Sequence, residues 1–489
     1  MCGIVGLFSN KPVSEPIIYG LGALQHRGQD AAGVVTFDGR FHTRKGTGLV
    51  AEVFRQAADR EDLVGHLGLG HARYATQGST ALLDAQPLTM NYPFGIAMIH
   101  NGNVTNFESL RTELESRHQR VLDTTNDLEL LLYTLAEEIG AEAETKPGGF
   151  SELGPAELFA AVARLRQRVE GAYSVLAIVA HKGLLAFRDD HGIRPLLYAH
   201  SGADHAFASE SAVFDCLGMG PVRDVGPGET VFIDMAGVAH VDAGTPAPRS
   251  AFCSFEHIYF AREDALFSGR RVASARLEMG RLLASAVQAR GLLPDVVIDV
   301  PSSAYFAAAG LAEALGVPYR RGLTKNNHIG RSFIVPSALD RARVVRQKLN
   351  PIPEVVAGRR VAVVDDSIVR GTTSRHIIRL LREAGAAAVY MVSAAPPLRH
   401  PCPYGIDIAR RAELVAAMLS HAELEEALGA DAVVYPALDD FKRLFADQGH
   451  CFACFDGDYP TAVTDETRRS IEREQVASGR RQVKVAVSV

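Results

Sequence analysis

The sequence contains few cysteines: six in 489 residues, only two of which form a close Cys-x-x-Cys pair. Small domains held together by disulfides carry many cysteines in a short chain. A disulfide framework is therefore excluded, and the cysteines point to catalysis or metal binding. The length is about three times that of a typical domain, so two or more domains are expected, each large enough to bury a core.

Long runs of a single charge are also absent. Lys and Arg number 51 against 57 Asp and Glu, which gives a net charge of -6, and no long basic block occurs. This balance argues against a nucleic-acid partner. Apolar stretches end well before the roughly 20 residues needed to cross a bilayer, and the N-terminus lacks a charged segment followed by an apolar core. We therefore expect no membrane span and a cytoplasmic protein.

The first half of the chain, to about residue 245, mixes short apolar runs with helical stretches, without internal repeats or low-complexity tracts. Its composition, 47% hydrophobic and 22% charged, is typical of a folded globular protein. Apolar runs bounded by turn residues predict strands, and longer periodic stretches predict helices. The predicted strands are 3–8, 94–100, 173–180 and 183–187, and the predicted helices are 126–140 and 155–169.

The second half changes pattern after the turn-rich stretch 244–250. Strand, loop and helix now follow one another in repeated order, which predicts a parallel sheet wrapped by helices. The predicted strands lie in 295–301, 358–367 and 388–395, and the predicted helices near 270–290, at 304–315 and at 373–384. The final stretch, about 466–489, is expected to be either a packed helix or a loose tail.

Cys2 follows the initiator methionine directly, and so small a residue commonly permits removal of Met1. Cys2 would then carry a free α-amino group, whose reference pKa of about 7.7 to 8.0 allows it to act as the base for its own thiol. The segment His100-Asn101-Gly102-Asn103 adds an amide side chain and a glycine backbone N–H, donors able to stabilise an oxyanion. Alone, Cys2 could equally begin an ordinary strand, and Asn-Gly is usually a turn.

Six segments, in order along the chain, closely resemble the glutaminase domain of the N-terminal-nucleophile glutamine amidotransferases. The resemblance implies an α+β domain, an αββα sandwich, over residues 2–245. It further implies that Cys2 attacks the side-chain amide of glutamine, that Asn101 and Gly102 form the oxyanion hole, and that Arg73 and Asp127 bind glutamine. Arg suits bidentate carboxylate binding. His26 and Arg27 are expected to support the site structurally. The segments are 1–6, 24–33, 45–50, 70–78, 100–103 and 125–129.

The segment 361–374 reads as a buried strand that ends in two acids and a Ser/Gly/Thr loop before a helix. Backbone N–H groups at a helix N-terminus and nearby hydroxyls suit a phosphate dianion, and adjacent carboxylates suit ribose hydroxyls or Mg²⁺. A pair of acids before a capped helix is also common in doubly wound sheets. Ligands in such sheets sit at the carboxyl ends of the strands, where this loop lies.

The full string resembles the phosphoribosyltransferase signature of the type I fold, and the resemblance implies such a domain over residues 251–465. Segment 295–303 would supply a pyrophosphate loop, and 325–334 a flap whose charges could neutralise departing pyrophosphate. The residues so assigned to phosphoribosylpyrophosphate are Asp365, Asp366, Ser367, Arg370, Gly371, Thr372, Thr373, Ser374, Lys325 and Arg331. Those assigned to Mg²⁺ are Ser303, Asp365 and Asp366.

The remaining cysteines could hold a metal, since four thiolates from separate segments can bind either zinc or an iron–sulfur cluster. An isolated Cys-x-x-Cys pair can also be structural coincidence. The segments 253–262, 400–407 and 451–460 resemble the cluster-binding segments of the iron–sulfur subclass of the glutamine phosphoribosylpyrophosphate amidotransferases. This resemblance implies that Cys253, Cys402, Cys451 and Cys454 ligate a structural 4Fe-4S cluster. Cys216 has no counterpart there and is interpreted as a buried small hydrophobe.

Together these resemblances cover Cys2 to about Pro460 and imply an amidophosphoribosyltransferase of purine synthesis. Ammonia from glutamine would pass inside the protein to C1 of phosphoribosylpyrophosphate, giving phosphoribosylamine, glutamate and pyrophosphate. Internal transfer is chemically sensible because ammonia released into water at neutral pH is protonated and no longer nucleophilic. The resemblance also implies Mg²⁺, feedback by purine nucleotides, and a homo-oligomer, either a tetramer or a dimer.

The chain departs from the family pattern in its second half. Ser302 stands where the family has an acid, although Ser303 is retained, and Asn327-His328 replaces Arg-Tyr in the flap. Asp456 and Asp458 also differ from the usual Thr and Lys. Two alternatives therefore stay open: a paralogue that delivers ammonia to another phosphorylated sugar in a side pathway, and a weakly catalytic regulator that binds phosphoribosylpyrophosphate or nucleotides. The intact glutaminase residues argue against the regulator.

Overall fold

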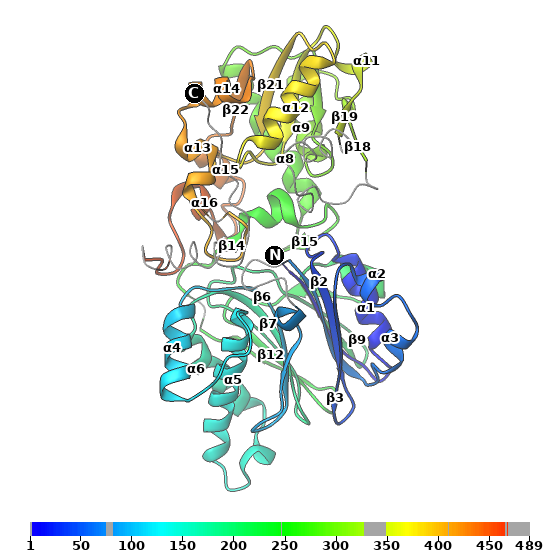
Figure 1. The fold of residues 1–489 in the computed structure, drawn as a ribbon, viewed down its shortest axis with the longest axis vertical. Coiled ribbons are helices and arrows are strands. Elements are labelled where there is room, and N and C mark those ends of the chain that lie inside the picture. The colour runs from blue at the N-terminus through cyan, green and yellow to red at the C-terminus, as the bar shows by residue number, and fades with distance from the viewer. Residues whose placement is uncertain are drawn as a thin grey trace.

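The chain folds into two bodies stacked end to end, the N-terminal one at the bottom of Figure 1 and the C-terminal one at the top. The computed structural model describes residues 2–74, 82–245, 247–326, 349–408, 410–464 and 467. None of the helices in these ranges is long and apolar enough to cross a membrane. The predicted C-terminal segment 466–489 lies outside the described residues, except for Thr467.

The N-terminal body is a sandwich of two antiparallel sheets. In order, the first sheet consists of β11 (Val222–Asp224), β9 (Leu197–Ser201), β10 (Asp204–Ala208), β1 (Gly3–Phe8), β4 (Leu67–Arg73), β2 (Ala31–Phe37) and β3 (Phe41–Thr47). The second consists of β13 (Ala239–Asp242), β12 (Thr230–Asp234), β8 (Gly183–Arg188), β7 (Gly171–Val179), β6 (Ile96–Val104) and β5 (Leu88–Met90).

Helices cover both outer faces of the sandwich and complete four layers. The first sheet is covered by α1 (Ser14–Ala23), α2 (Val50–Val53), α3 (Ala58–Glu61) and α7 (Ala212–Leu217), and the second by α4 (Phe107–Arg117), α5 (Asp127–Glu144) and α6 (Pro155–Arg168). The sequence of β7 is apolar throughout because both faces of the strand are buried. Leu176 and Ile178 pack between the sheets, while Val175, Ala177 and Val179 pack under the helices. The predicted αββα sandwich is confirmed.

The C-terminal body is built on a parallel sheet in the order β17 (Val296–Asp299), β20 (Arg360–Asp365), β21 (Ala388–Ser393), β22 (Ala432–Val434). One face is covered by α8 (Val272–Ala289) and α9 (Tyr305–Leu315), the other by α12 (Thr372–Glu383) and α14 (His421–Leu428). Helices α8 and α9 approach closely because Gly280 and Gly310 lack side chains: a Cβ on Gly280 would lie 2.0 Å from the Ala307 carbonyl oxygen. The predicted parallel α/β sheet is confirmed.

Small elements join the two bodies and border the second sheet. Pairs of short strands are β14 (Phe252–Cys253) with β23 (His450–Cys451), β15 (Leu266–Phe267) with β16 (Arg270–Arg271), and β18 (Leu323–Lys325) with β19 (Leu349–Pro351). Short helices are η3 (Glu256–Phe260), α11 (Pro353–Val356), α13 (Val415–Met418), α15 (Leu438–Arg443) and α16 (Ala453–Asp456). The described residues of 243–251, the stretch where the sequence changes pattern, form no strand or helix; the domain limits themselves stay predictions.

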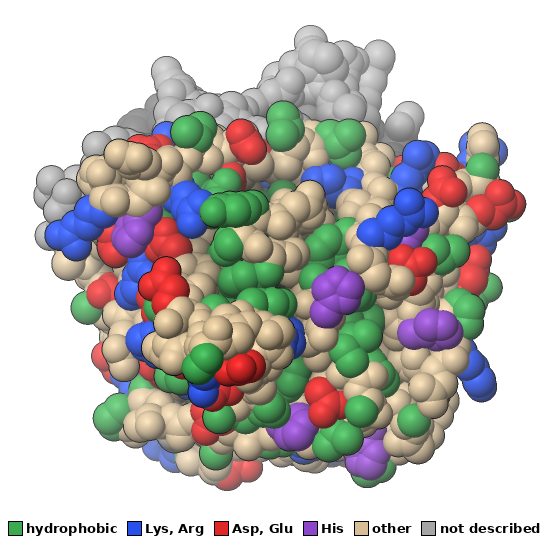
Figure 2. Space-filling model, turned by 90° about the horizontal axis from the view of Figure 1, so that it is seen from below, with side chains coloured by type: hydrophobic (Ala, Val, Ile, Leu, Met, Phe, Trp, Pro, Cys, Tyr) green, Lys and Arg blue, Asp and Glu red, His purple; other side chains and the backbone are tan. Residues whose placement is uncertain are grey.

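The bodies meet at one end of the sandwich, where β1 begins and where β4 and β6 end. Asn103 in β6 donates from Nδ2 to the Pro403 carbonyl oxygen at 2.8 Å, and Tyr74 Oη lies 3.4 Å from Asp407 Oδ2. Both contacts reach the 403–407 loop of the C-terminal body. At the opposite end of the N-terminal body, basic and acidic side chains are interspersed over the surface seen in Figure 2.

Candidate functional site

Cys2 stands at the inter-body end of the sandwich, directly before β1. Its N–H donates to Asn101 Oδ1 at 3.1 Å, and its Sγ lies 3.6 Å from the Tyr74 carbonyl oxygen. The antiparallel register of Gly3 with Ala72 places Cys2 opposite Arg73 on β4. Cys2 is 9% exposed, so the thiol is held at a fixed, nearly closed position against three other segments.

Asn101 and Gly102 follow one another on β6 beside Cys2. The Asn101 amide accepts from Cys2 through Oδ1, whereas its Nδ2 is buried and has no hydrogen-bond partner among the described residues. A buried donor without a partner lowers the stability of the fold, and a ligand oxygen that accepts its hydrogen bond removes that penalty. A Cβ at Gly102 would lie 1.9 Å from the Ala172 carbonyl oxygen, so only glycine fits there. Both features suit the predicted oxyanion hole.

Arg73 and Asp127 frame the same end of the sandwich. Arg73 ends β4 and is 3% exposed. Asp127 begins α5, and its Oδ2 accepts from the Val104 backbone N–H at 2.9 Å and from His100 Nε2 at 3.2 Å. The structure thus brings the two charges predicted to bind glutamine to the end of β4 and the end of β6, where Cys2 also lies.

Arg27 and His26 support this site, as predicted from the sequence. Arg27 Nε donates to the Cys2 carbonyl oxygen at 3.1 Å, and its guanidinium also binds Glu210. His26 Nε2 lies 2.7 Å from Glu210 Oε1. Burial alone would raise the pKa of Glu210, but Arg27 and His26 instead lower it to about 2. Glu210 was missed by sequence reasoning, because it lies 183 positions from Arg27 in no recognised motif.

The second predicted site lies at the carboxyl edge of the parallel sheet. Strand β20 ends at Asp365, and the following loop runs to Gly371, which caps α12 with φ +70°, a left-handed conformation that favours glycine. The hydroxyl residues Thr372 and Thr373 are exposed in the first turn of α12. This strand, loop and helix N-terminus have the arrangement expected for binding a phosphate.

Two further residues assigned to the phosphoribosyl ligand, Arg370 in the loop and Ser374 in α12, contact or face the protein itself. Ser374 is 2% exposed, so its hydroxyl faces the interior of the body. Arg370 binds Glu413, with Nε 2.7 Å from Oε2. Their assignment to the phosphoribosyl ligand stays a prediction.

Asp365 and Asp366 form a buried acidic pair at the strand end. Asp366 accepts from Ser303 Oγ and, at 2.8 Å, from Ser367 Oγ, while its N–H donates to Asp365 Oδ1 at 3.0 Å. Burial raises the pKa of both carboxyls, and for Asp365 repulsion by Asp366 raises it further. Ser303 therefore joins the pair, as predicted, in a cluster of oxygen atoms of the kind that Mg²⁺ prefers.

Charged residues that the sequence reasoning missed surround the acidic pair. Arg276 of α8 is buried, donates to the carbonyl oxygens of His257 and Ala261 at 2.9 Å each, and lowers the pKa of Asp366 against the effect of burial. Asp299 ends β17 on the same edge and accepts from Tyr319 Oη at 3.0 Å. Asp299 lies within the segment 295–303 that was predicted to supply the pyrophosphate loop, but its apolar neighbours gave no sign that this acid ends the strand.

The flap is only partly described. Lys325 ends β18 and is half-buried. Arg331, with Asn327 and His328, falls within 327–348 and lies outside the described residues. Ser302, which replaces the family acid, is exposed next to Ser303.

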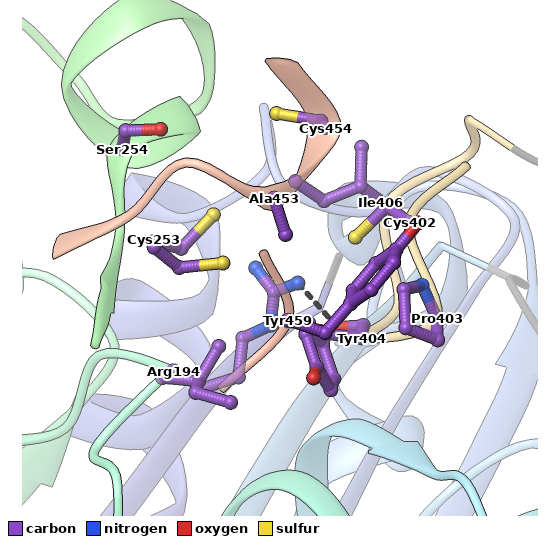
Figure 3. Close-up of a pocket in the computed structure, with 12 residues that line it drawn as sticks. Arg194, Cys253, Ser254, Cys402, Pro403, Tyr404, Ile406, Ala453, Cys454 and Tyr459 are labelled. Carbon is purple, nitrogen blue, oxygen red and sulfur yellow. Dashed lines mark hydrogen bonds between the residues drawn. The ribbon is translucent and has the colours of Figure 1, made fainter. Parts of the chain in front are cut away.

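Four cysteines from three segments surround one cavity (Figure 3). Cys253 on β14 and Cys451 on β23 are paired in register, Cys454 lies in α16, and Cys402 precedes the 403–407 loop. Arg194, Tyr404 and Tyr459 line the same cavity. The structure thus brings together all four cysteines that the sequence analysis singled out.

The cavity fits a thiolate-bound group. Burial raises the pKa of Cys253 to about 11 and raises the pKa of Cys451 and Cys454, so these thiols need a cation to ionise. Ser254 Oγ lines the cavity and has no hydrogen-bond partner among the described residues. Among the described residues, no group of three or more His, Cys, Asp or Glu side chains is arranged to hold a metal ion. The 4Fe-4S cluster stays a prediction.

The interpretation of Cys216 as a buried hydrophobe is wrong: the residue is exposed. Cys216 lies in the last turn of α7. The first turn of α7, with Ala212, Val213 and Phe214 buried, packs against α1. The helix then extends beyond that contact and ends at Leu217, leaving Asp215 and Cys216 at the surface.

Comparison with known proteins agrees with this geometry. The glutamine amidotransferase domain family matches residues 71–215. The amidophosphoribosyltransferase of Pseudomonas aeruginosa is 41% identical over 479 residues, 95% of this chain and 94% of its own length. That of Escherichia coli K12 is 41% identical over 449 residues, 90% of this chain and 88% of its own length.

A solved structure resembles both bodies together. The glutamine phosphoribosylpyrophosphate amidotransferase from B. subtilis, complexed with ADP and GMP, is 36% identical with a TM-score of 0.83, covering 95% of this chain and 98% of that one. A structure of the allosteric regulatory enzyme of purine biosynthesis is also 36% identical, with a TM-score of 0.84, and covers 95% of this chain and 97% of that one.

Proposed function

The chain belongs to the amidophosphoribosyltransferase family, and we propose that its two bodies carry out the two halves of glutamine-dependent phosphoribosylamine synthesis. The N-terminal body hydrolyses glutamine, and the C-terminal body uses the ammonia to displace pyrophosphate from phosphoribosylpyrophosphate. The observation that carries this proposal is the position of Cys2: it lies at the end of the sandwich that touches the C-terminal body.

In the first half-reaction Cys2 is the nucleophile. After removal of Met1, the α-amine of Cys2 takes the thiol proton while Sγ bonds to the amide carbon of glutamine. The amide oxygen gains negative charge, which Asn101 Nδ2 and the Gly102 N–H stabilise. The amine returns the proton to the leaving nitrogen, ammonia departs, and water hydrolyses the thioester to glutamate. Because Asn101 is buried and its Nδ2 has no other partner, this donor is in place before the charge develops.

Substrate selection follows from the two buried charges. An α-amino acid carries one carboxylate and one ammonium, and Arg73 and Asp127 offer one opposite charge for each. The carboxylate of Asp127 is oriented by Val104 and His100, both of which contact Oδ2. We therefore assign Arg73 to the carboxylate of glutamine and Asp127 to its ammonium.

In the second half-reaction the loop after β20 binds phosphoribosylpyrophosphate. The N-terminus of α12, with Thr372 and Thr373, holds the 5-phosphate, and Asp365 and Asp366 face the ribose hydroxyls. Ammonia attacks C1, a C–N bond forms as the C–O bond to pyrophosphate breaks, and a proton leaves the nitrogen. Lys325 and Arg331 are assigned to the departing pyrophosphate.

Two inorganic groups belong to this proposal. Ser303, Asp365 and Asp366 would hold Mg²⁺, which neutralises phosphate charge when bound. Cys253, Cys402, Cys451 and Cys454 would hold a 4Fe-4S cluster, which ties three segments of the C-terminal body together when bound. Four thiols that line one cavity suit either group, and the resemblance to the iron–sulfur subclass favours the cluster over a single zinc ion.

Regulation and assembly are proposed by analogy with relatives. Purine nucleotides are assigned as inhibitors because the B. subtilis relative was solved with ADP and GMP. A homo-oligomer, a tetramer or a dimer, and a cytoplasmic location are carried over from the sequence analysis.

A paired assay tests the function. Protein purified without oxygen receives glutamine, Mg²⁺ and phosphoribosylpyrophosphate, and glutamate and pyrophosphate are measured together. The proposal predicts equal amounts of both products, with glutamate formation dependent on phosphoribosylpyrophosphate. Glutamate without pyrophosphate would contradict it and favour another phosphorylated acceptor, for which Ser302, Asn327 and His328 would be the first residues to restore to the family pattern.

A further inference from the structure

A fully buried group of charges links the nucleophile to the C-terminal body. Arg27 is at the centre: its Nε donates to the Cys2 carbonyl oxygen at 3.1 Å, and its side chain is 0% exposed. The other guanidinium nitrogens face two carboxylates. One, Glu210, belongs to the N-terminal body, and the other, Glu256, begins the helix η3 of the C-terminal body.

Both carboxylate oxygens of Glu256 accept hydrogen bonds from Arg27. Oε1 accepts from Nη2 at 2.8 Å and Oε2 from Nη1 at 3.0 Å, the bidentate geometry in which an arginine and a carboxylate bind most firmly. Glu256 is also 0% exposed. The orientation of the Arg27 guanidinium, and hence of its Nε toward Cys2, is therefore fixed from the other body.

The same carboxylate faces the four-cysteine cavity on its far side. Arg194 Nη1 lies 3.8 Å from Glu256 Oε1, and Arg194 Nε donates to the Tyr404 carbonyl oxygen at 2.8 Å. Arg194 lines the cavity together with Cys253 and Cys402 (Figure 3). Glu256 thus stands between an arginine that touches the nucleophile residue and an arginine that touches the cavity.

We propose that Glu256 is a positioning residue through which the C-terminal body sets the orientation of Cys2 for glutamine hydrolysis. The inference rests on the proposed role of Cys2 as nucleophile. Its physical basis is that buried charges are tolerated only when fully paired, and here two arginines alternate with two glutamates. Removing the charge of Glu256 leaves Arg27 to be held by Glu210 alone, which draws the guanidinium toward Glu210 and away from the Cys2 carbonyl.

The test is the variant Glu256→Gln, which keeps the shape and removes the charge. We expect the rate at which an electrophilic glutamine analogue alkylates Cys2 to fall about 10- to 100-fold, with a matching loss in glutaminase kcat, because small displacements of a reacting group have effects of this size. The KM for glutamine should stay within about threefold, since Arg73 and Asp127 are untouched. Pyrophosphate release driven by added ammonia should be unchanged, which a general loss of structure would not allow.

Two further variants keep the test decisive. Asp458→Asn removes an exposed ion pair with Arg249, at 2.6 Å, and should leave alkylation within about twofold of wild type, because exposed pairs contribute little. Glu256→Asp retains the charge on a shorter side chain and should recover part of the alkylation rate. If Glu256→Gln does not fold, the comparison of Glu256→Asp with wild type carries the test.

The proposal is overturned if the Glu256 variants alkylate at the wild-type rate, or if they lose ammonia-dependent and glutamine-dependent activity in equal proportion. These failures differ from a failure of the proposed function, which would appear in the wild-type protein as alkylation at a residue other than Cys2.

Discussion

The two bodies differ in how their sites are completed. Around Cys2 the protein itself supplies a partner for each backbone and thiol group: Asn101 for the N–H, Arg27 for the carbonyl and Tyr74 for the thiol. Around Asp365 and Asp366 the protein gathers negative charge in a buried place, and the pKa of both carboxyls rises. The first site is organised in advance for a reaction on a neutral amide, whereas the second is organised for ligands that bring their own charge.

The largest expected effect is that of Cys2→Ala, which removes the nucleophile from the organised site. Glutamine-dependent synthesis should fall by at least about 10⁴-fold, because no nearby group can replace the thiol. Ammonia-dependent pyrophosphate release should continue, since the second site is intact. Steady-state rates with glutamine and with ammonium salts, measured side by side, check this. Full glutamine-dependent activity in the variant would contradict the nucleophile assignment.

Asn101→Ala should have the next largest effect. Loss of one oxyanion donor lowers kcat for glutamine hydrolysis by about 10²- to 10³-fold, with little change in KM. The measurement is a glutaminase titration with glutamine. A variant that raised KM and preserved kcat would show that Asn101 binds the ground state instead, and the first site would then be less organised for the transition state than we describe.

The matched charges beside Cys2 predict a pH dependence of stability. The pKa of Glu210 falls from its ordinary value of 4.5 to about 2 in the folded protein. A lowered folded-state pKa stabilises the fold above the unfolded value, and that contribution is lost as pH falls from about 4.5 to about 2. The contribution is on the order of 3 kcal/mol.

Urea unfolding of wild type and Glu210→Gln between pH 7 and pH 2 measures this contribution. The difference in unfolding free energy between the two proteins should be greatest at neutral pH and should shrink below pH 4.5. A difference that stayed constant down to pH 2 would mean that the Glu210 carboxylate is not stabilised by Arg27 and His26.

Asp365→Asn should have the smallest effect on rate and the opposite effect on stability. Removing one charge of the buried pair should raise the unfolding free energy by about 1 kcal/mol, as often happens when a functional site loses a destabilising group. Synthesis from either nitrogen source should fall about 10- to 100-fold. Thermal unfolding and both assays check this, and a destabilised variant would show that the pair is not strained by repulsion.

The strands and helices could be predicted well from the sequence, for a physical reason. Strands such as β7 and β20 are buried on both faces and read as continuous apolar runs, and α12 begins where Gly371 and two threonines permit it. Cys2 directly precedes β1, Asp366 directly follows β20, and Asn101 stands in the second half of β6, and each lies in a motif that the local sequence marks.

The partners of those residues could not be predicted, because they are distant in sequence. Arg27 binds Glu210 and Glu256, which are 183 and 229 positions away, and nothing local distinguishes these glutamates from surface ones. Cys216 was misjudged for the converse reason: its apolar neighbours indicate burial, while the place where α7 leaves the body decides its exposure.

Transfer of nitrogen between the two bodies inside one molecule is the central claim, and isotope competition tests it most directly. Glutamine labelled with ¹⁵N in its amide is supplied with phosphoribosylpyrophosphate in an excess of unlabelled ammonium, and the phosphoribosylamine is trapped for mass spectrometry. The account predicts a product carrying mostly ¹⁵N, because the ammonia released at Cys2 does not mix with the solvent. A product labelled only in proportion to the bulk ammonium would contradict it.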